Sequence, residues 1–521
     1  MDVTGKSESL ERPGPARAGF RPGGGAKDLT QGPIGKTLIL FSLPVMGSNV
    51  LQSLNGTANA IWVSHVLGEA ALTATANANN ILFLMLGAVF GISMAANLMI
   101  GQSIGARDEA MVKRVIGTST GFFVVLSLSV GVGGWLLTPT ILTAMDTPAD
   151  ARAEAITYLR VIFMAMPFMY FFSFLMMAQR GAGDSRSPFW FSLAAVGLDV
   201  ILNPILITGY GPAPRMGIAG SAAATLISQT VVLGAILVFL YRTRSVLVLW
   251  PHEFKLLKPE LAIIRTLVTK GLPMAVQMLV ISGAAVVMIS FVNRYGSATA
   301  AGYAAAVQLW TYVQMPAMAM GAAVSSMAAQ NVGAGRMDRV NRIAGMGSLY
   351  AALLSAGPVV VIYLIEPIIL RLFLPAGSPS IPIAIHINAI VLWGFIPFGV
   401  AFALSGVVRA TGAVMMPLLF MALSLWGVRV PFALLLEPVL GAEAVWWSFP
   451  LGSITSCLLA VGYFLFGGWR KAQLLGGIPR GEPVDTGLGG GPPPEESEAL
   501  EAASRSAPPA PRRRESEAPA E

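Results

Sequence analysis

The sequence predicts an all-α integral membrane protein whose twelve transmembrane helices form one helical unit repeated twice. Its residues are 55% hydrophobic and only 12% charged, whereas an ordinary soluble domain carries about 25% charged residues. Twelve apolar stretches are each long enough to cross a bilayer, which takes roughly 20 residues per helix. A segment near residue 102 also returns near residue 330. These three observations indicate a helical bundle in a membrane, built by duplication.

The predicted spans follow one another through short turns marked by Gly or Pro, which interrupt helices. In chain order they cover residues 37–62, 74–101, 115–138, 156–178, 188–208, 217–241, 267–292, 301–328, 342–365, 382–408, 414–436 and 443–467.

The repeat is clearest where QSIGARDEAMVKRVIG, residues 102–117, returns as QNVGAGRMDRVNRIAG, residues 330–345. Nearly the same offset along the chain relates Pro44 to Pro273 and Arg180 to Arg409. Duplicated hydrophobic halves are a recurrent plan of secondary transporters, because two lobes that rock about a central site give alternating access. The repeat therefore favours transport.

The two ends of the chain differ from its apolar middle. The polar, Gly- and Pro-rich start lacks the layout of a signal peptide, and from about residue 476 the chain becomes rich in Pro, Gly, Ser and Glu. We expect residues 1–35 and 471–521 to be disordered tails, because such compositions cannot bury a core. The only cysteine, Cys457, lies in the last predicted span, which excludes a disulfide framework and a thiolate metal site.

The net charge of +7 reflects membrane topology rather than nucleic-acid binding. If both tails are cytoplasmic, 28 of the 34 Lys and Arg residues fall in the tails and loops on that side. The opposite side holds only Arg152, Arg215, Arg294 and Arg371. Cytoplasmic loops carry an excess of basic residues, so we expect a multi-pass protein of the cell inner membrane with both termini cytoplasmic.

Six segments, in the same order, carry a family resemblance: LPVMGSNVLQSLNGTANAIWVSHVLG, IGQSIGARDEAMVKR, RGAGDSRSP, LNPILITGYGP, MGIAGSAAATLISQ and SLWGVRVPFALLL. They resemble the multidrug and toxic compound extrusion (MATE) family, most closely its prokaryotic branch related to the DNA-damage-inducible F (DinF-like) transporters. The resemblance covers residues 36–470. It implies a MOP-flippase-like fold of two pseudo-symmetric six-helix bundles around a central cavity, a first lobe over 36–241 and a second over 267–470, with residues 242–266 as a cytoplasmic linker and hinge.

The same resemblance implies a function. The protein is expected to be a monomer among membrane lipids that exports amphipathic organic cations, drugs or metabolites in exchange for H⁺ or Na⁺, with no cofactor besides the coupling ion. One departure matters. In this branch the first span usually carries an acid where this chain has Asn59. Its fifth span carries Asn and then Asp, whereas this chain carries the same pair in reversed order, as Asp199 and Asn203.

Asp199 is the one acidic residue that lies well inside a predicted span, and an intramembrane carboxylate is a functional candidate by default. Asn203 follows four residues later on the same helix face. Pro204 removes the hydrogen bond to the Val200 carbonyl, so three kinds of oxygen would cluster within a turn. That cluster suits a sodium ion at Asp199 and Asn203, or a protonated acid. In the plainer interpretation, Asp199 is a permanently neutral packing residue and Pro204 only kinks the helix.

Polar residues also recur at helical spacing on the first and sixth spans, and polar stripes in lipid must face protein or water. They are Asn49, Gln52, Asn55 and Asn59, and then Ser221, Thr225 and Ser228. We expect Asn59, Asp199, Asn203 and Thr225 to form the ion-coupling site, although such residues also serve as hydrogen-bonding contacts between helices. The duplicated positions are Met288, Val428 and Phe432, so coupling should belong to the first lobe.

Cargo binding is predicted from adaptable and aromatic side chains, because Met changes shape easily and aromatic rings attract organic cations. The predicted cavity residues are Gln52, Asn55, Met164, Met166, Tyr170, Gln308, Tyr312 and Arg429. Met and Phe also face lipid or pack for no special reason. Arg429, buried mid-span, either pairs with helix carbonyls or with Glu437, or sets the electric field of the cavity.

The sequence contains no phosphate-binding loop, paired His–Glu metal motif or nucleophile elbow, so a gradient should supply the energy and an enzyme is not expected. The main alternative in the same superfamily is a lipid-linked oligosaccharide flippase. That activity favours additional spans or a markedly cationic cavity.

Overall fold

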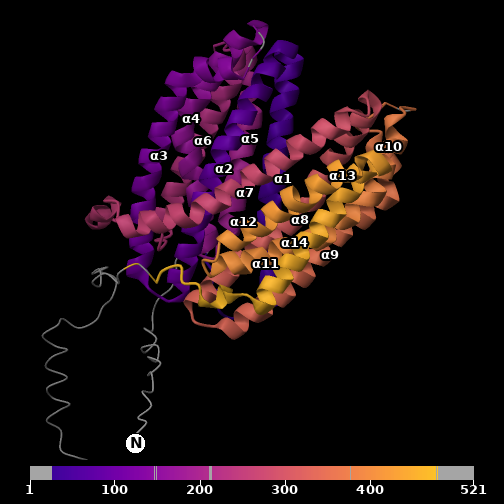
Figure 1. Ribbon diagram of the computed structural model, residues 1–521. Coiled ribbons are helices and arrows are strands. Elements are labelled where there is room, and N and C mark those ends of the chain that lie inside the picture. Colours follow the sequence, from indigo (N-terminus) through magenta and orange to yellow (C-terminus); the bar gives the residue numbers. More distant parts are fainter. Residues whose placement is uncertain are drawn as a thin grey trace, which may run out of the picture. The chain divides into compact units, whose positions relative to one another are not determined.

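A computed structural model describes residues 26–478, except Asp146, Pro148, residues 211–213, Ala376 and Gly477. The described chain is helical throughout and contains no strand. Figure 1 shows two groups of helices, the first in indigo to magenta and the second mainly in orange to yellow. The expected disorder of residues 1–25 and 479–521 concerns segments outside the described residues.

The first lobe contains the first six long helices, which continue past the predicted apolar cores by several residues at most ends. They are α1 Ile34–Leu67, α2 Glu69–Gly105, α3 Glu109–Ala144, α4 Ala149–Gly181, α5 Arg186–Thr208 and α6 Ile218–Arg242. Polar caps set some of the boundaries. The Asp108 carboxylate accepts a hydrogen bond from the Met111 amide at 2.9 Å and begins α3.

The second lobe repeats this plan, with two of its spans built from consecutive helical pieces. They are α7 Leu261–Asn293, α8 Ser297–Gly333, α9 Met337–Leu370, α10 Ser380–Val391 with η2 Leu392–Gly394 and α11 Phe395–Ala410, α12 Met415–Ala422 with the π-helix η3 Leu423–Arg429 and α13 Val430–Leu440, and α14 Ala442–Phe466. Over both lobes, eleven spans of the described chain are long and apolar enough to cross a membrane. The twelfth is α8, which has 37 residues. The twelve helices and two bundles expected from the sequence are confirmed for the described chain.

The duplicated motif forms a reciprocal contact between the lobes, which we call the seam and define as Gln102–Gly105 and Gln330–Gly333. The Gln102 side chain donates a hydrogen bond to the Ala410 carbonyl at 2.7 Å. Its counterpart Gln330 donates to the Gly181 carbonyl at 3.0 Å. Gly181 and Ala410 directly follow Arg180 and Arg409, which the repeat relates to each other. Each copy of the motif therefore holds the end of a helix in the same way.

The glycines of the seam are required by the closeness of the two backbones. A Cβ on Gly105 would lie 1.8 Å from the Gln330 carbonyl oxygen, and one on Gly333 would lie 1.9 Å from the Gln102 carbonyl oxygen. Each motif therefore presents a glycine to the glutamine backbone of the other. A second close approach, between α2 and α7, uses Gly91 and Gly271 in the same manner.

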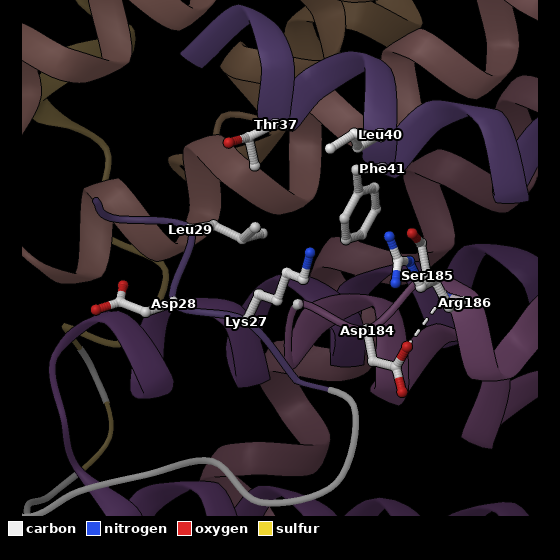
Figure 2. A pocket seen from close by; sticks show the side chains of 10 residues that line it. Lys27, Asp28, Leu29, Thr37, Leu40, Phe41, Asp184, Ser185 and Arg186 are labelled. Carbon is white, nitrogen blue, oxygen red and sulfur yellow. Dashed lines mark hydrogen bonds between the residues drawn. The ribbon is translucent and has the colours of Figure 1, made fainter. Parts of the chain in front are cut away.

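The segment before α1 is packed at the seam, although the sequence assigned it to a disordered tail. The Leu29 amide donates to Gln330 Oε1 at 2.9 Å, and Asn331 Nδ2 donates to the Leu29 carbonyl at 3.1 Å. Leu29 is 1% exposed. Figure 2 shows Lys27, Asp28 and Leu29 beside the turn at Asp184. The first described residues of the chain therefore cross from one lobe to the other.

The connection between the lobes is also a packed part of the structure rather than a free strand. Its short 3-10 helix η1, Pro251–Leu257, lies on α3. The Lys113 ammonium pairs with the Glu253 carboxylate at 3.0 Å, with both side chains almost fully buried. Arg114 Nε donates to Glu260 Oε1 at 2.9 Å. The second lobe begins at Leu261, ahead of the predicted boundary at residue 267, because α7 extends beyond its apolar core.

We expect the change Gly333→Ala to destabilise the seam, because its new methyl group would meet the Gln102 carbonyl. Overpacking of this kind costs about 1–3 kcal/mol, so the thermal unfolding temperature in detergent should fall by several degrees. Gly345→Ala is the matched control, because no heavy atom outside the helix backbone lies within 4 Å of its Cβ position. Equal unfolding temperatures for the two variants would contradict the steric argument.

Candidate functional site

Asp199 lies at the centre of a polar cluster inside the first lobe. Its side chain is buried, with 3% exposure, on the face of α5 that packs against α1 and α6. Thr225 Oγ1, on α6, donates to Asp199 Oδ1 at 3.1 Å. The Asn55 amide, on α1, also hydrogen-bonds to the carboxylate. The carboxylate thus links three helices, and the predicted convergence of spans 1, 5 and 6 is seen.

Asn59 lies beside this group in a separate set of contacts. Its Oδ1 atom accepts a hydrogen bond from Ser221 Oγ at 2.7 Å. The buried Tyr158 hydroxyl on α4 also hydrogen-bonds to the Asn59 side chain. Sequence reasoning did not mark Tyr158 as part of this site. Asn55 rather than Asn59 is therefore the amide in contact with the acid.

Two amide oxygens near Asp199 are buried without a hydrogen-bond partner in the described chain. They are Asn55 Oδ1 and Asn203 Oδ1, and Asn203 is 1% exposed. Buried polar atoms are usually paired, so two unpaired acceptors near a carboxylate favour a cation at this position. α5 continues through Pro204 as a helix, which leaves the Val200 carbonyl without its usual amide donor. The oxygen atoms present suit a sodium ion or a proton.

A cavity lies between the two lobes, near the seam, and encloses about 770 Å³ including its open mouth. Helices of both lobes line it. Its polar residues are Asn49, Asn97, Gln277, Arg180 and Arg409. The rest of its wall is apolar and includes five methionines and Phe90 and Phe402. Only the adaptable, Met-rich character of the predicted cargo site is found here.

The family comparisons agree with this architecture. A family model described as MatE matches residues 44–205 and, a second time, residues 273–435. The chain belongs to the MatE family. The two matched segments begin at Pro44 and Pro273, which the sequence repeat also relates to each other. The resemblance to MATE transporters is thereby confirmed, and the protein is a multi-pass membrane transporter.

Individual relatives align with most of this chain, and the alignments include nearly all of each relative. The chain is 34% identical over 441 residues to the "Probable multidrug resistance protein YoeA" of Bacillus subtilis, covering 84% of this chain and 95% of YoeA. It is 32% identical over 453 residues to the "Probable multidrug resistance protein YpnP" of the same organism, covering 86% and 99%. A solved multidrug resistance MATE family transporter of the MOP superfamily, in an outward-facing conformation, matches with a TM-score of 0.77 and 22% identity, over 86% of this chain and 98% of that one.

The residues predicted to bind cargo lie outside this cavity of the MatE protein. Met166 and Tyr170 are part of the packed core of the first lobe, because that face of α4 meets neighbouring helices. Met164 points outward and is 57% exposed. None of the predicted cavity residues lines the cavity between the lobes in the described structure; this includes Gln52, Asn55, Gln308, Tyr312 and Arg429.

Arg429 packs against an aromatic ring, whereas helix carbonyls and Glu437 were the partners considered for it. Its guanidinium carbon lies 4.5 Å from the centre of the Phe449 ring, a cation–π arrangement. Glu437 is engaged elsewhere, at 3.6 Å from Arg294 and 3.1 Å from the Tyr295 hydroxyl. Burial and the hydrogen bond to Glu437 raise the pKa of Tyr295. Of the alternatives considered for Arg429, the pairing with Glu437 is therefore not found in the described chain.

The second lobe also carries a buried acid, although Asp199 was the one acid expected well inside a span. Met288, Val428 and Phe432 occupy the duplicated positions, as expected. However, Glu366, one turn before the end of α9, is only 4% exposed. Asn388 Nδ2 donates to Glu366 Oε1 at 2.6 Å, and Trp310 Nε1 donates to Asn388 Oδ1 at 2.8 Å. This chain of bonds joins α8, α9 and α10.

Asn388→Ala should destabilise the second lobe, because it leaves both Glu366 and Trp310 without a buried partner. The loss of hydrogen bonds to a buried acid costs about 1.5–3 kcal/mol, which should lower the unfolding temperature in detergent. Asn341→Ala is the control, because Asn341 is exposed and accepts a hydrogen bond only from Arg470, at 3.2 Å. A variant at 388 as stable as the control would show that this chain of bonds adds nothing.

Proposed function

We propose that this MatE transporter is a cation-coupled antiporter that exports amphipathic organic compounds, drugs or metabolites by alternating access. The observation that carries the proposal is Asp199, a buried carboxylate bonded to α1 and α6 with unpaired amide oxygens beside it. The names of YoeA and YpnP, both called "Probable multidrug resistance protein", support the choice of cargo.

The energetic argument rests on the cost of a bare charge in the membrane. An ionised carboxylate at this depth costs several kcal/mol, so binding of H⁺ or Na⁺ to Asp199 is favoured over the empty, charged state. Moving one charge across the membrane is worth about 2.3 kcal/mol per 100 mV. A tenfold concentration ratio corresponds to about 1.4 kcal/mol. A single carrier can therefore drive a cargo gradient of more than tenfold.

The contacts of Asp199 also offer a path from ion binding to motion. Asn55 ties the carboxylate to α1, and α1 packs against α8 of the second lobe. When Asp199 changes charge, its hydrogen bonds to Asn55 and Thr225 must change in strength. A shift of α1 would then act directly on the contact between the lobes. Coupling by the first lobe alone is part of the proposal.

We further propose a monomer in the cell inner membrane, with the seam facing the cytoplasm. The excess of basic residues in the tails and loops supports this orientation. Contacts among the segments at the seam end, such as Lys27 amide to Gly183 carbonyl at 3.4 Å and Lys270 to the Gly412 carbonyl at 2.9 Å, bring several of these loops together.

The alternative is a lipid-linked oligosaccharide flippase of the same superfamily. One observation favours it, since the cavity between the lobes contains two buried arginines that the sequence had not marked as cavity residues. A cationic cavity suits a phosphate-bearing cargo. Drug efflux and flipping differ in whether an imposed ion gradient drives export.

Everted membrane vesicles, energised separately by a pH gradient and by a sodium gradient, test the coupling. Asp199→Asn should abolish gradient-driven dye transport, because the amide neither ionises nor releases a cation. Asp108→Asn is the control, since an Asn retains the helix cap and lies at a helix end. The double variant Asp199→Asn with Asn55→Asp should regain part of the transport, because it returns an acid to the contacting helix. Full transport by Asp199→Asn alone would disprove the mechanism.

A further inference from the structure

The cavity between the lobes contains one buried arginine from each half of the duplicated chain. Arg180 lies in the last turn of α4 and Arg409 in the last turn of α11, and the two occupy equivalent positions of the repeat. Both line the cavity, and they are 7% and 6% exposed. We propose that these two guanidinium groups form an anion-binding site for the carboxylate or phosphate group of an amphipathic organic anion.

Neither arginine has a carboxylate partner in the described chain. Arg180 approaches only the Met177 sulfur, at 4.0 Å. Arg409 donates to Gln277 Oε1 at 3.4 Å and lies 5.2 Å from the Phe402 ring centre. The Nε atoms of both arginines are buried without an acceptor. Unpaired donors on two buried cations point to a missing anion.

Another buried cation of the first lobe, unlike Arg180, has a carboxylate partner. Lys113, which is buried like Arg180, has Glu253 at 3.0 Å. The acid nearest Arg180 in sequence, Asp184, is already engaged, because its Oδ1 atom accepts from the amides of Arg186 and Ser187 at 3.0 Å each (Figure 2). Among the residues that line the cavity there is no acid to neutralise the arginines.

The energetic cost of the two buried cations favours a ligand that carries a negative charge. A buried cation without a partner is strongly destabilising, because its charge has lost the water that would solvate it. A carboxylate or phosphate accepts hydrogen bonds from guanidinium groups in a paired geometry, so an anion in the cavity would supply the acceptors that these arginines lack.

The other residues that line the cavity indicate the chemistry of the rest of the ligand. Met94, Met274, Met278 and Met318 line the same cavity as the arginines and give it an adaptable apolar wall. An acid head group and an apolar body fit this wall. This conclusion rests on the proposed export of amphipathic compounds and replaces the expected organic cation with an organic anion.

The site also joins the two lobes. Arg180 precedes Gly181, whose carbonyl accepts from Gln330, and Arg409 precedes Ala410, whose carbonyl accepts from Gln102. An anion held by both arginines therefore bridges the lobes beside the seam. Separation of the seam would pull the arginines apart and release the anion, so binding and lobe closure are linked.

Equilibrium dialysis with radiolabelled dodecanoate, on the full chain in phosphatidylcholine nanodiscs, tests the site. Arg180→Gln and Arg409→Gln should each weaken dodecanoate binding about tenfold, which corresponds to about 1.4 kcal/mol. Dodecylammonium, the charge-reversed probe, should bind wild type more weakly than dodecanoate does. Arg429→Gln is the matched control, because Arg429 lies outside this cavity, and it should bind dodecanoate as wild type does.

Thermal unfolding separates a binding role from a structural one. Dodecanoate should raise the unfolding temperature of wild type and leave that of the two glutamine variants unchanged. Arg180→Lys keeps the charge and should retain part of the effect if the glutamine variants fail to fold. Wild-type binding by both glutamine variants, or a preference of wild type for dodecylammonium, would overturn the proposal.

Two further experiments extend this test. The first identifies the source of the anion, and the second separates failure of the anion site from failure of the coupling mechanism. Phosphatidylglycerol in the nanodiscs should displace dodecanoate if a lipid head group occupies the site, and should have no effect if a soluble acid does. Asp199→Asn should bind dodecanoate normally, since no gradient is involved. Full efflux by Asp199→Asn, with dodecanoate binding still lost in the arginine variants, would refute only the coupling. Unaltered binding in the arginine variants, with efflux still lost in Asp199→Asn, would refute only the anion site.

Discussion

The rest of the structure depends on the steric fit of the two glycines at the seam. Gly105 and Gly333 let the backbones of two distant helices touch, and no other residue type leaves enough room for a carbonyl oxygen at that distance. The glutamines beside them then hold the ends of α4 and α11. Through these helix ends the seam determines the positions of Arg180 and Arg409, and hence the polarity of the cavity that they line. A short motif of the sequence thus determines a chemical property of helices far from it in the chain.

Sequence reasoning found the features that one helix reveals by itself. The twelve apolar stretches, the repeat, and the shared face of Asp199 and Asn203 all follow from periodicity and from the rarity of acids in lipid. Features that need a second helix were missed or misplaced. Tyr158 carries no local signal, and Glu366 is buried only because α10 supplies Asn388. Methionines were likewise assigned to cargo by type, whereas packing decides which of them face a cavity.

The two lobes treat their buried acids in opposite ways. Glu366 belongs to a chain of bonds in which Asn388 and Trp310 are both satisfied, so it reinforces the packing of its lobe. Asp199 is contacted from two helices, yet amide oxygens of Asn55 and Asn203 near it remain unpaired. An incompletely satisfied cluster is a place where an ion changes the energy most. The same scaffold thus occurs twice, and the buried acids of its two copies differ in how completely the polar groups around them are hydrogen-bonded.

The packing of the linker determines where the molecule can bend. Lys113 and Arg114 fasten residues up to Glu260 onto α3, whereas the duplicated position of Lys113 is the exposed Asn341. The connection is therefore fastened to the first lobe along most of its length. The stretch expected to act as a hinge is held on α3, and a bend between the lobes would have to fall after Glu260, where these ion pairs end.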